Sequence, residues 1–177
     1  RWKEDVIWHR HPLSPKDAKR GTVGIPRVLN MYEDFPFWHA FFGRLGYRVL
    51  TSSEQIRDIS TEAMETIPSY SECFPAKLAH THVADLAKHH PDFIWYPCID
   101  KGPDEGSTNS YHCPMVASYP ENIEANMDEV LGKYKVKLLH PFLPLHAQKP
   151  LLKQLKKVFA PMGISSRSLK FAMDFFA

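Results

Sequence analysis

The sequence predicts an α/β protein with a doubly wound, mostly parallel sheet flanked by helices. Short apolar segments rich in β-branched and aromatic residues alternate along the chain with longer segments whose apolar residues recur every three to four positions. Glycine and proline stand where this alternation requires elements to end or begin. Strands separated by helices require right-handed crossover connections, which place neighbouring strands parallel to one another.

The first strand and helix have the clearest local signals. Residues 22–29 form an apolar, largely β-branched run that predicts a strand, and residues 35–45 carry aromatic residues at a spacing of four, which predicts a helix. Gly46 follows that helix at the position where a left-handed residue commonly ends one. Residues 47–51 are expected to form the second strand. Ser52, with Gln55 three residues later, resembles a capping box that opens a helix over 52–66.

The remaining elements follow the same alternation. Pro75 is suited to the first turn of a helix over 73–89, and residues 93–96 are expected to form a buried strand. A long surface loop is expected over 97–114, because this stretch is rich in glycine, proline and small polar residues. We expect strands at 115–119 and 136–139 and helices at 120–134, 149–159 and 165–175. Together these elements favour a flavodoxin-like or Rossmann-like arrangement.

The chain of 177 residues has the length of one domain. Residues 1–20 contain two prolines and no clear apolar period, and they are expected to be an extended lead-in or linker. Residues 21–177 are then a single α/β domain. Because the chain opens on Arg1 and closes within an apolar run, we interpret it as a fragment of a larger multidomain protein.

Charge and hydropathy argue against nucleic acids and membranes as partners. The formal net charge is +2, from 22 basic and 20 acidic residues, with no long block of one sign to bind nucleic acid. Apolar stretches are interrupted well before the roughly 20 residues that a membrane span needs, and no signal peptide opens the chain. We therefore expect no nucleic-acid partner, no membrane partner and a cytoplasmic location.

Cys73, Cys98 and Cys113 are the candidate metal ligands. An odd number of widely spaced cysteines does not form a disulfide framework. Each cysteine lies within two residues of a proline and at a loop or helix start near a predicted strand end, where an open parallel sheet gathers its ligand-binding loops. Three thiolates at that edge could hold an iron–sulfur cluster, although spacings of 25 and 15 residues match no compact cluster motif, and buried inert cysteines are the alternative.

Histidines offer a second metal chemistry. A tetrahedral Cys₃His zinc site would need His112 or His80 as its fourth ligand. His80 and His82 are two residues apart on a predicted helix, so they cannot share a face. The other histidines considered are interpreted as surface or helix-end residues rather than ligands, namely His39, His89, His90, His140 and His146.

A few further residues could act near the cysteines. Lys77 lies one turn after Cys73 and could lower its pKa or meet an anion, although a solvated lysine is the simpler interpretation. Glu72 is a candidate acid–base residue, but no partner carboxylate is visible. Arg27 and Asn30 end the first strand and could support the site indirectly. The aromatic run FPFWHAFF is interpreted as core.

Four segments carry a resemblance to a known family: GIPRVLNMYEDFPFWHAFFGRLGYRVL (24–50), IPSYSECFPAKLAHTHVADL (67–86), DFIWYPCI (92–99) and NSYHCPMVASYPE (109–121). They resemble the domain fused to activases of (R)-2-hydroxyacyl-CoA dehydratases, the CoA-substrate-specific enzyme activases, which is itself similar to the cluster-bearing dehydratase subunits. The resemblance covers roughly residues 21–140 and is densest around the three cysteines.

The resemblance implies a [4Fe-4S] cluster ligated by Cys73, Cys98 and Cys113, which an isolated fragment need not retain. It implies ATP-driven, low-potential electron transfer in anaerobic metabolism. ATP would bind only in neighbouring activase domains, since no GxxxxGK[ST] motif occurs here. The implied partners are those activase domains and a CoA-thioester substrate or dehydratase-like subunit. This fragment alone is expected to be inactive. The alternative is a non-catalytic interaction domain with packed or zinc-binding cysteines.

Overall fold

A computed structural model describes residues 2–102 and 111–174, and its centre is a parallel four-stranded sheet. The strand order is β2-β1-β3-β4, and every neighbouring pair is parallel. The strands are β1 (Thr22–Ile25), β2 (Arg48–Thr51), β3 (Phe93–Trp95) and β4 (Lys137–Leu139). The predicted doubly wound α/β fold is confirmed.

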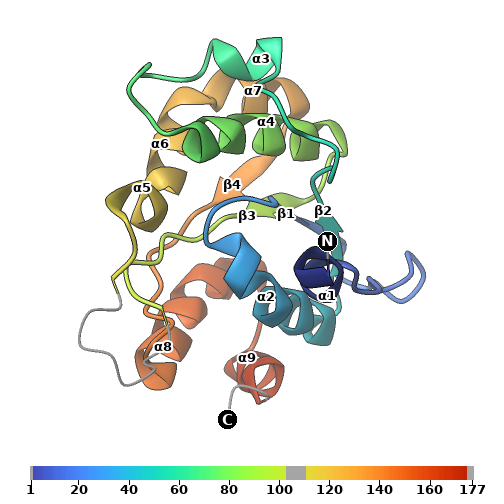
Figure 1. Cartoon of the computed structure of the whole chain (residues 1–177). Helices are drawn as coiled ribbons and strands as arrows, with labels where there is room; N and C mark the ends of the chain where they lie inside the picture. The colour runs from blue at the N-terminus through green and yellow to red at the C-terminus, as the bar shows by residue number, and fades with distance from the viewer. Residues whose placement is uncertain (1, 103–110, 175–177) are drawn as a thin grey trace.

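Helices cover both faces of this sheet (Figure 1). One face carries α2 (Met31–Leu45), α8 (Gln148–Phe159) and α9 (Ser166–Met173), with α1 (Trp2–Trp8) packed beside α2. The opposite face carries α3 (Thr61–Met64), α4 (Phe74–Lys88), α6 (Tyr119–Asn126) and α7 (Asp128–Tyr134). Two short helices complete the described elements, α5 (Pro114–Ala117) and η1 (Ala160–Met162).

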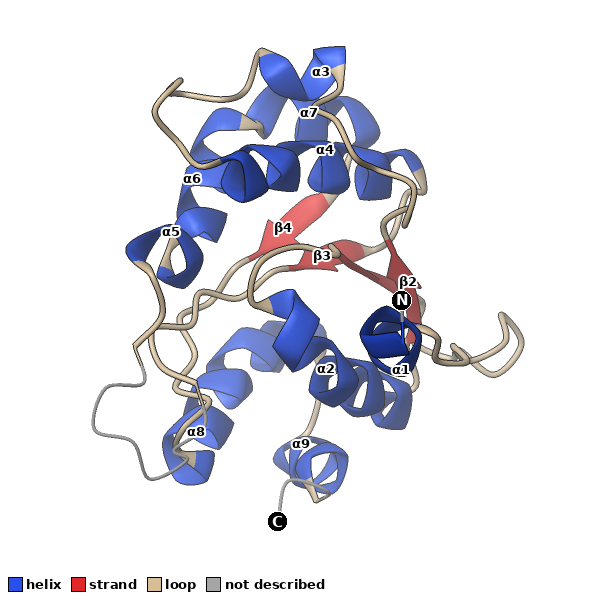
Figure 2. Cartoon of the chain, viewed as in Figure 1, coloured by secondary structure: helices blue, strands red, loops and turns tan. Residues whose placement is uncertain are grey.

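The strand order creates a switch point between β1 and β3. The chain leaves β1 for α2 on one face, whereas it leaves β3 for α5 and α6 on the other side of the sheet (Figure 2). In open parallel sheets the crevice beyond the carboxyl ends of two such strands is the usual place for a ligand. Cys98 follows the last residue of β3 by three positions and so lies close to this edge.

The core on the α2 face is aromatic. Trp38 is fully buried, and its ring centroid lies 5.0 Å from that of Trp95 on β3. Phe42 and Phe159 pack on the same Trp95 ring. The prediction that the FPFWHAFF run belongs to the core is therefore confirmed, with Phe37 only partly buried.

The sequence signals that mark helix ends are confirmed where they depend on the backbone geometry of one residue. Gly46 ends α2 with φ +91°, and its N–H donates to the carbonyl of Gly43. Cys73 is the N-cap of α4, and Pro75 lies in its first turn. These match the sequence predictions, because each signal acts through the residue's own backbone preference.

The predicted helix over 52–66 is wrong. Ser52 is buried, where its hydroxyl oxygen accepts the N–H of Arg27 at 2.9 Å and its O–H pairs with His82 Nδ1 at 2.8 Å. The hydroxyl is therefore used in tertiary contacts and does not cap a helix. The helix that does form is α3, and its N-cap is Ser60, whose side chain accepts the N–H of Ala63.

Three other segments differ from expectation. The predicted strand at 115–119 contains helix α5, because Cys113 and Pro114 start a helical turn. The predicted helix at 120–134 is two helices, α6 and α7, interrupted at Met127. Within the expected lead-in, residues 2–8 form α1, and Trp8 is buried against α2.

Two boundary observations complete the fold. Residues 103–110 of the expected loop, and the end of the expected terminal helix at residue 175, lie outside the described residues. Within residues 2–102 and 111–174, none of the helices combines the length and apolar character that crossing a bilayer requires.

Candidate functional site

Cys98 lies just beyond β3 and is held there by the chain that follows β4. Its N–H donates to the carbonyl of Pro141 at 3.0 Å, and its carbonyl accepts the N–H of Leu143 at 2.9 Å. A parallel bridge to Phe142 thus continues the pairing of β3 with β4 past their ends. Cys98 is fully buried, so its sulfur has a fixed position in the protein interior.

The side chains that meet Cys98 come from two other elements. Glu121 lies in the first turn of α6, and His140 directly follows β4. One ligand atom from each of Cys98, Glu121 and His140 lies within 4.8 Å of the other two. His140 Nδ1 is 2.9 Å from Glu121 Oε1, and the backbone N–H of Glu121 donates to the Cys98 sulfur.

Burial controls the protonation of Cys98. It raises the thiol pKa to about 12, the charge of Glu121 adds to the increase, and the backbone N–H of Glu121 partly opposes it. As a free thiol Cys98 is therefore protonated at neutral pH. A metal ion that uses this sulfur must displace the proton.

Cys73 is an exposed free thiol at the N-terminus of the 15-residue helix α4. It lies near Tyr119, whose pKa is raised mainly by burial and by the contact with Glu72, with a smaller contribution from Cys73. Tyr119 O–H donates to Glu72 Oε2 at 2.6 Å. Glu72, the residue before Cys73, is thus held by a tyrosine from α6. The sequence alone did not indicate this contact between Glu72 and Tyr119.

The hydrogen-bond chain at Tyr119 continues into the interior. His80 Nε2 lies 3.0 Å from the Tyr119 hydroxyl, and His80 Nδ1 lies 2.7 Å from Thr66 Oγ1. Tyr119 donates to Glu72 and so offers its oxygen to the Nε2–H of His80. Thr66, whose O–H donates to the Ala63 carbonyl at 2.8 Å, lies against His80 Nδ1. His80 is therefore committed to this chain. Its role as a zinc ligand, one of the options in the sequence, would require breaking both contacts.

Cys113 is the N-cap of α5 and is exposed and free. His112, the other histidine considered for zinc, has its backbone N–H bonded to the carbonyl of Asp100. The group formed by Cys98, Glu121 and His140 does not contain Cys73 or Cys113. Thiolates around a four-iron cube stand roughly 6–7 Å apart, wider than single-ion spacing. The absence of Cys73 and Cys113 from this single-ion group therefore does not test their ligation of a cluster, which stays a prediction.

Tyr96 directly follows β3, and its N–H donates to the carbonyl of Leu139 at the end of β4. Its side chain is fully buried, and its hydroxyl has no hydrogen-bond partner among the described residues. Burial raises its pKa far above the ordinary value, and the charge of Cys98 adds to the increase. An unpaired buried hydroxyl costs about 1–3 kcal/mol, so this O–H is available to an acceptor beside Cys98.

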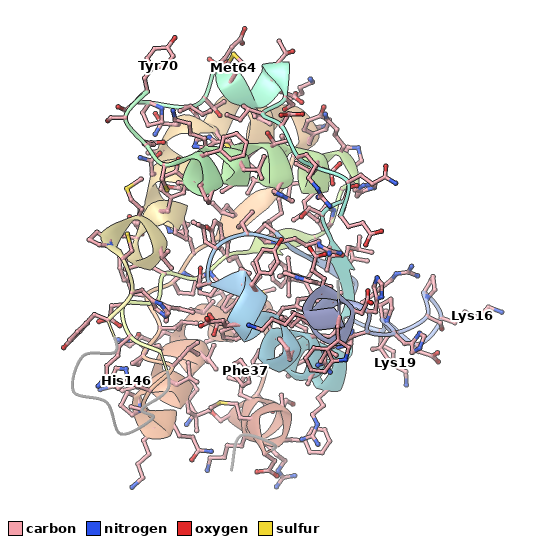
Figure 3. The ribbon with its side chains drawn as sticks, in the orientation of Figure 1. Lys16, Lys19, Phe37, Met64, Tyr70 and His146 are labelled. Carbon is pink, nitrogen blue, oxygen red and sulfur yellow. The ribbon has the colours of Figure 1, made fainter. Side chains whose placement is uncertain are left out.

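The other residues singled out from the sequence are used elsewhere. Lys77 donates to the backbone carbonyl of Tyr70, an exposed residue that points outward in Figure 3. Arg27 is buried, with its guanidinium over the Trp8 ring and a nitrogen 3.7 Å from Glu54. Asn30 donates to Asp34. These contacts give each side chain a packing role.

A hollow of about 970 Å³ lies among α3, α4, α6 and α7. Glu62 on its wall forms ion pairs with Lys133 at 2.9 Å and Lys88 at 3.2 Å, and the hydrogen bond from Lys133 leads in holding its pKa below the ordinary value. None of the cysteines lines this hollow. The cysteines predicted to bind a metal therefore lie outside this hollow.

His140 is the residue that sequence reasoning missed, because it was set aside as a surface or helix-end histidine. It follows its strand directly, as Cys98 closely follows the neighbouring strand. Parallel strands bring such residues to one edge. The signal in the sequence was that His140 and Cys98 each follow a strand. Using it to place the two residues together required knowing that β3 and β4 are neighbours.

Acidification is expected to destabilise the protein through its buried histidines. Burial lowers the pKa of both His80 and His82 to about 4, from an ordinary 6.5. Between these values the unfolded state binds more protons, so stability is lost as pH falls from about 6.5 to 4. Burial raises the pKa of Asp34 to about 6, which offsets one histidine. The net loss is on the order of 3 kcal/mol.

Urea unfolding at pH 7 and pH 4.5 measures this loss. His80→Gln is expected to remove most of the pH dependence, because His82 and Asp34 then nearly cancel. His146→Gln, a change at an exposed histidine (Figure 3), is expected to leave it unchanged. Equal pH dependence in the wild type and His80→Gln would contradict the assignment.

Comparison with known proteins adds one match. A family model described as CoA enzyme activase uncharacterised domain matches residues 22–175, which include the whole sheet and all three cysteines. Neither the curated proteins nor the solved structures contain a significant match to the chain.

Proposed function

Since the chain belongs to the CoA enzyme activase uncharacterised domain family, we propose that it is the part of a CoA-substrate-specific activase or 2-hydroxyacyl-CoA dehydratase-like protein that holds an iron–sulfur cluster. Cys73, Cys98 and Cys113 are the proposed ligands of a [4Fe-4S] cluster. The proposed role is ATP-driven, low-potential electron transfer. The activase domains of the same polypeptide bind the ATP, and a CoA-thioester substrate or dehydratase-like subunit is the proposed acceptor.

The observation that carries this proposal is the position of the three free thiols. Cys98 follows β3, Cys73 begins the helix before β3, and Cys113 begins the next helix after it. In a parallel sheet, the residues that leave a strand and those that begin the following helix lie at the carboxyl-end edge. This order of elements supports the proposal that all three thiols lie at the edge where this fold binds ligands.

The chemical groups at this edge are suited to holding an iron–sulfur cluster. All three thiols are free, as ligation requires. Cys73 is the N-cap of α4, and the positive end of a helix dipole favours an anionic group such as a thiolate-ligated cluster there. The Tyr96 hydroxyl beside Cys98 lacks a described partner, and the Glu121 N–H already donates to Cys98. Hydrogen bonds of this kind to cluster sulfurs tune the reduction potential.

The chain's own residues also set the charge around the proposed ligands. When bound, a [4Fe-4S] cluster supplies one-electron transfer. Glu72, the residue before Cys73, accepts the Tyr119 hydrogen bond and brings a carboxylate close to that thiol. A nearby negative charge disfavours the addition of an electron and so lowers a reduction potential. This direction agrees with the proposed low-potential role.

Anaerobic reconstitution with iron and sulfide tests the proposal. The protein is expected to take up about four irons and four sulfides, with the broad visible absorption of thiolate-bound clusters. The measurement is iron and acid-labile sulfide per chain, with the absorption spectrum. Stoichiometric zinc binding without uptake of iron and sulfide would overturn the proposal. It would favour the alternative, a non-catalytic interaction domain with packed or zinc-binding cysteines.

A further inference from the structure

Cys98, Glu121 and His140 each bring one potential metal-ligand atom to the same place. Their ligand atoms lie within 4.8 Å of one another, and His140 Nδ1 and Glu121 Oε1 are 2.9 Å apart. Two ligand atoms at about 2.0–2.1 Å from a tetrahedral ion stand roughly 3.3 Å apart. A shift of a few tenths of an ångström therefore brings the imidazole and carboxylate to bonding positions.

Three separate elements hold these ligands, so the arrangement comes from the fold. The bridge beyond β3 and β4 fixes Cys98, β4 leads directly into His140, and α6 carries Glu121 in its first turn. Cys98 is fully buried, whereas His140 is partly buried and Glu121 is exposed. The group thus extends from the interior to the surface, where an ion can enter.

The donor set selects the kind of ion. One thiolate, one imidazole and one carboxylate match zinc, whereas magnesium and calcium prefer oxygen ligands alone. The ionised thiolate and carboxylate together carry two negative charges, which a divalent ion neutralises.

The surroundings supply the remaining features of a metal site. A hollow of about 380 Å³ is lined by both Glu121 and His140, so solvent reaches these two ligands and could fill a fourth position. The second ring nitrogen of His140, Nε2, lies 3.7 Å from Glu124 Oε2. Histidines that bind metal commonly direct their other N–H at a carboxylate, which holds the ring in place.

We propose that Cys98, Glu121 and His140 bind one zinc ion in a tetrahedral site whose fourth position faces this hollow. On binding, the sulfur–metal bond forms and the Cys98 proton leaves to solvent. This site goes beyond the proposed cluster, although the two share Cys98. They differ in their other ligands, since the cluster uses Cys73 and Cys113, and the zinc site uses Glu121 and His140.

Cobalt(II), a visible substitute for zinc, tests the site under anaerobic conditions. One cobalt per chain is expected to bind with tetrahedral visible bands and a thiolate-to-cobalt charge-transfer band, and zinc is expected to displace it. Glu121→Gln and His140→Gln are expected to weaken binding by at least about tenfold. Cys98→Ser is expected to remove the charge-transfer band. His146→Gln, Cys73→Ser and Cys113→Ser are the matched controls and are expected to bind as the wild type does.

Two results would overturn the zinc site: no cobalt or zinc binding by the wild type, or binding unchanged in both Glu121→Gln and His140→Gln. These two ligands reach the surface, so circular dichroism can confirm that their variants fold even if Cys98→Ser does not. Iron and sulfide uptake in the same variants separates the two proposals. The cluster requires Cys73 and Cys113, and the zinc site does not.

Discussion

Replacing Cys73 with serine is expected to lower the iron content of the reconstituted protein from about four per chain to about one or fewer, with the fold intact. Two remaining thiolates do not hold a four-iron cube firmly. The structure makes this variant informative, because Cys73 is an exposed N-cap and serine is among the best N-cap residues. We therefore expect no loss of folding free energy.

The same reasoning applies to Cys113, the exposed N-cap of α5. Tyr70→Ser is the matched control, because Tyr70 is fully exposed three residues before Cys73. Iron and sulfide per chain, measured together with urea unfolding, separate ligation from stability. Full uptake of iron and sulfide by folded Cys73→Ser would remove Cys73 from the ligand set, and with it the proposed three-cysteine site.

Replacing Trp38 with alanine is expected to cost about 3–5 kcal/mol of unfolding free energy. Trp38 is fully buried, and its ring contacts those of Trp95 and Phe41 between α2 and the sheet. Truncation leaves a cavity at the centre of this face. Because domains commonly have only about 5–15 kcal/mol of stability, the variant is expected to be near the limit of folding.

Urea unfolding followed by circular dichroism measures this cost. Trp2→Ala is the matched control, because Trp2 is 77% exposed and its loss is expected to change stability by less than about 0.5 kcal/mol. If Trp38→Ala does not fold, Trp38→Phe is expected to fold with a smaller loss, about 1–2 kcal/mol. Equal stability of Trp38→Ala and the wild type would show that this aromatic layer does not support the sheet.

Several elements could be predicted because their signals are local. Gly46 ends α2 because a left-handed backbone suits glycine, and Pro75 begins α4 because its ring fixes a helical φ and its missing N–H is not needed there. The alternation of strand and helix follows from apolar periodicity over a few residues. Neither kind of signal depends on which elements become neighbours.

Ser52 shows where a local signal fails. The pattern with Gln55 resembles a capping box, but His82 and the backbone of Arg27 use the Ser52 hydroxyl in the interior. Both partners are distant in sequence: Arg27 meets Ser52 because β1 and β2 are neighbouring strands, and His82 meets it from α4. A buried hydroxyl keeps the contacts that satisfy it, so tertiary packing overrides the local pattern.

The sequence by itself determined the fold class, and it singled out three cysteines at loop or helix starts. Which side chains surround those cysteines was decided only by the tertiary structure. His140 meets Cys98 because β3 and β4 are neighbours in the sheet, and Tyr119 reaches Glu72, the residue before Cys73, because α6 packs near α4. Strand order and helix packing depend on long-range burial of apolar surface, which periodicity within one element does not encode.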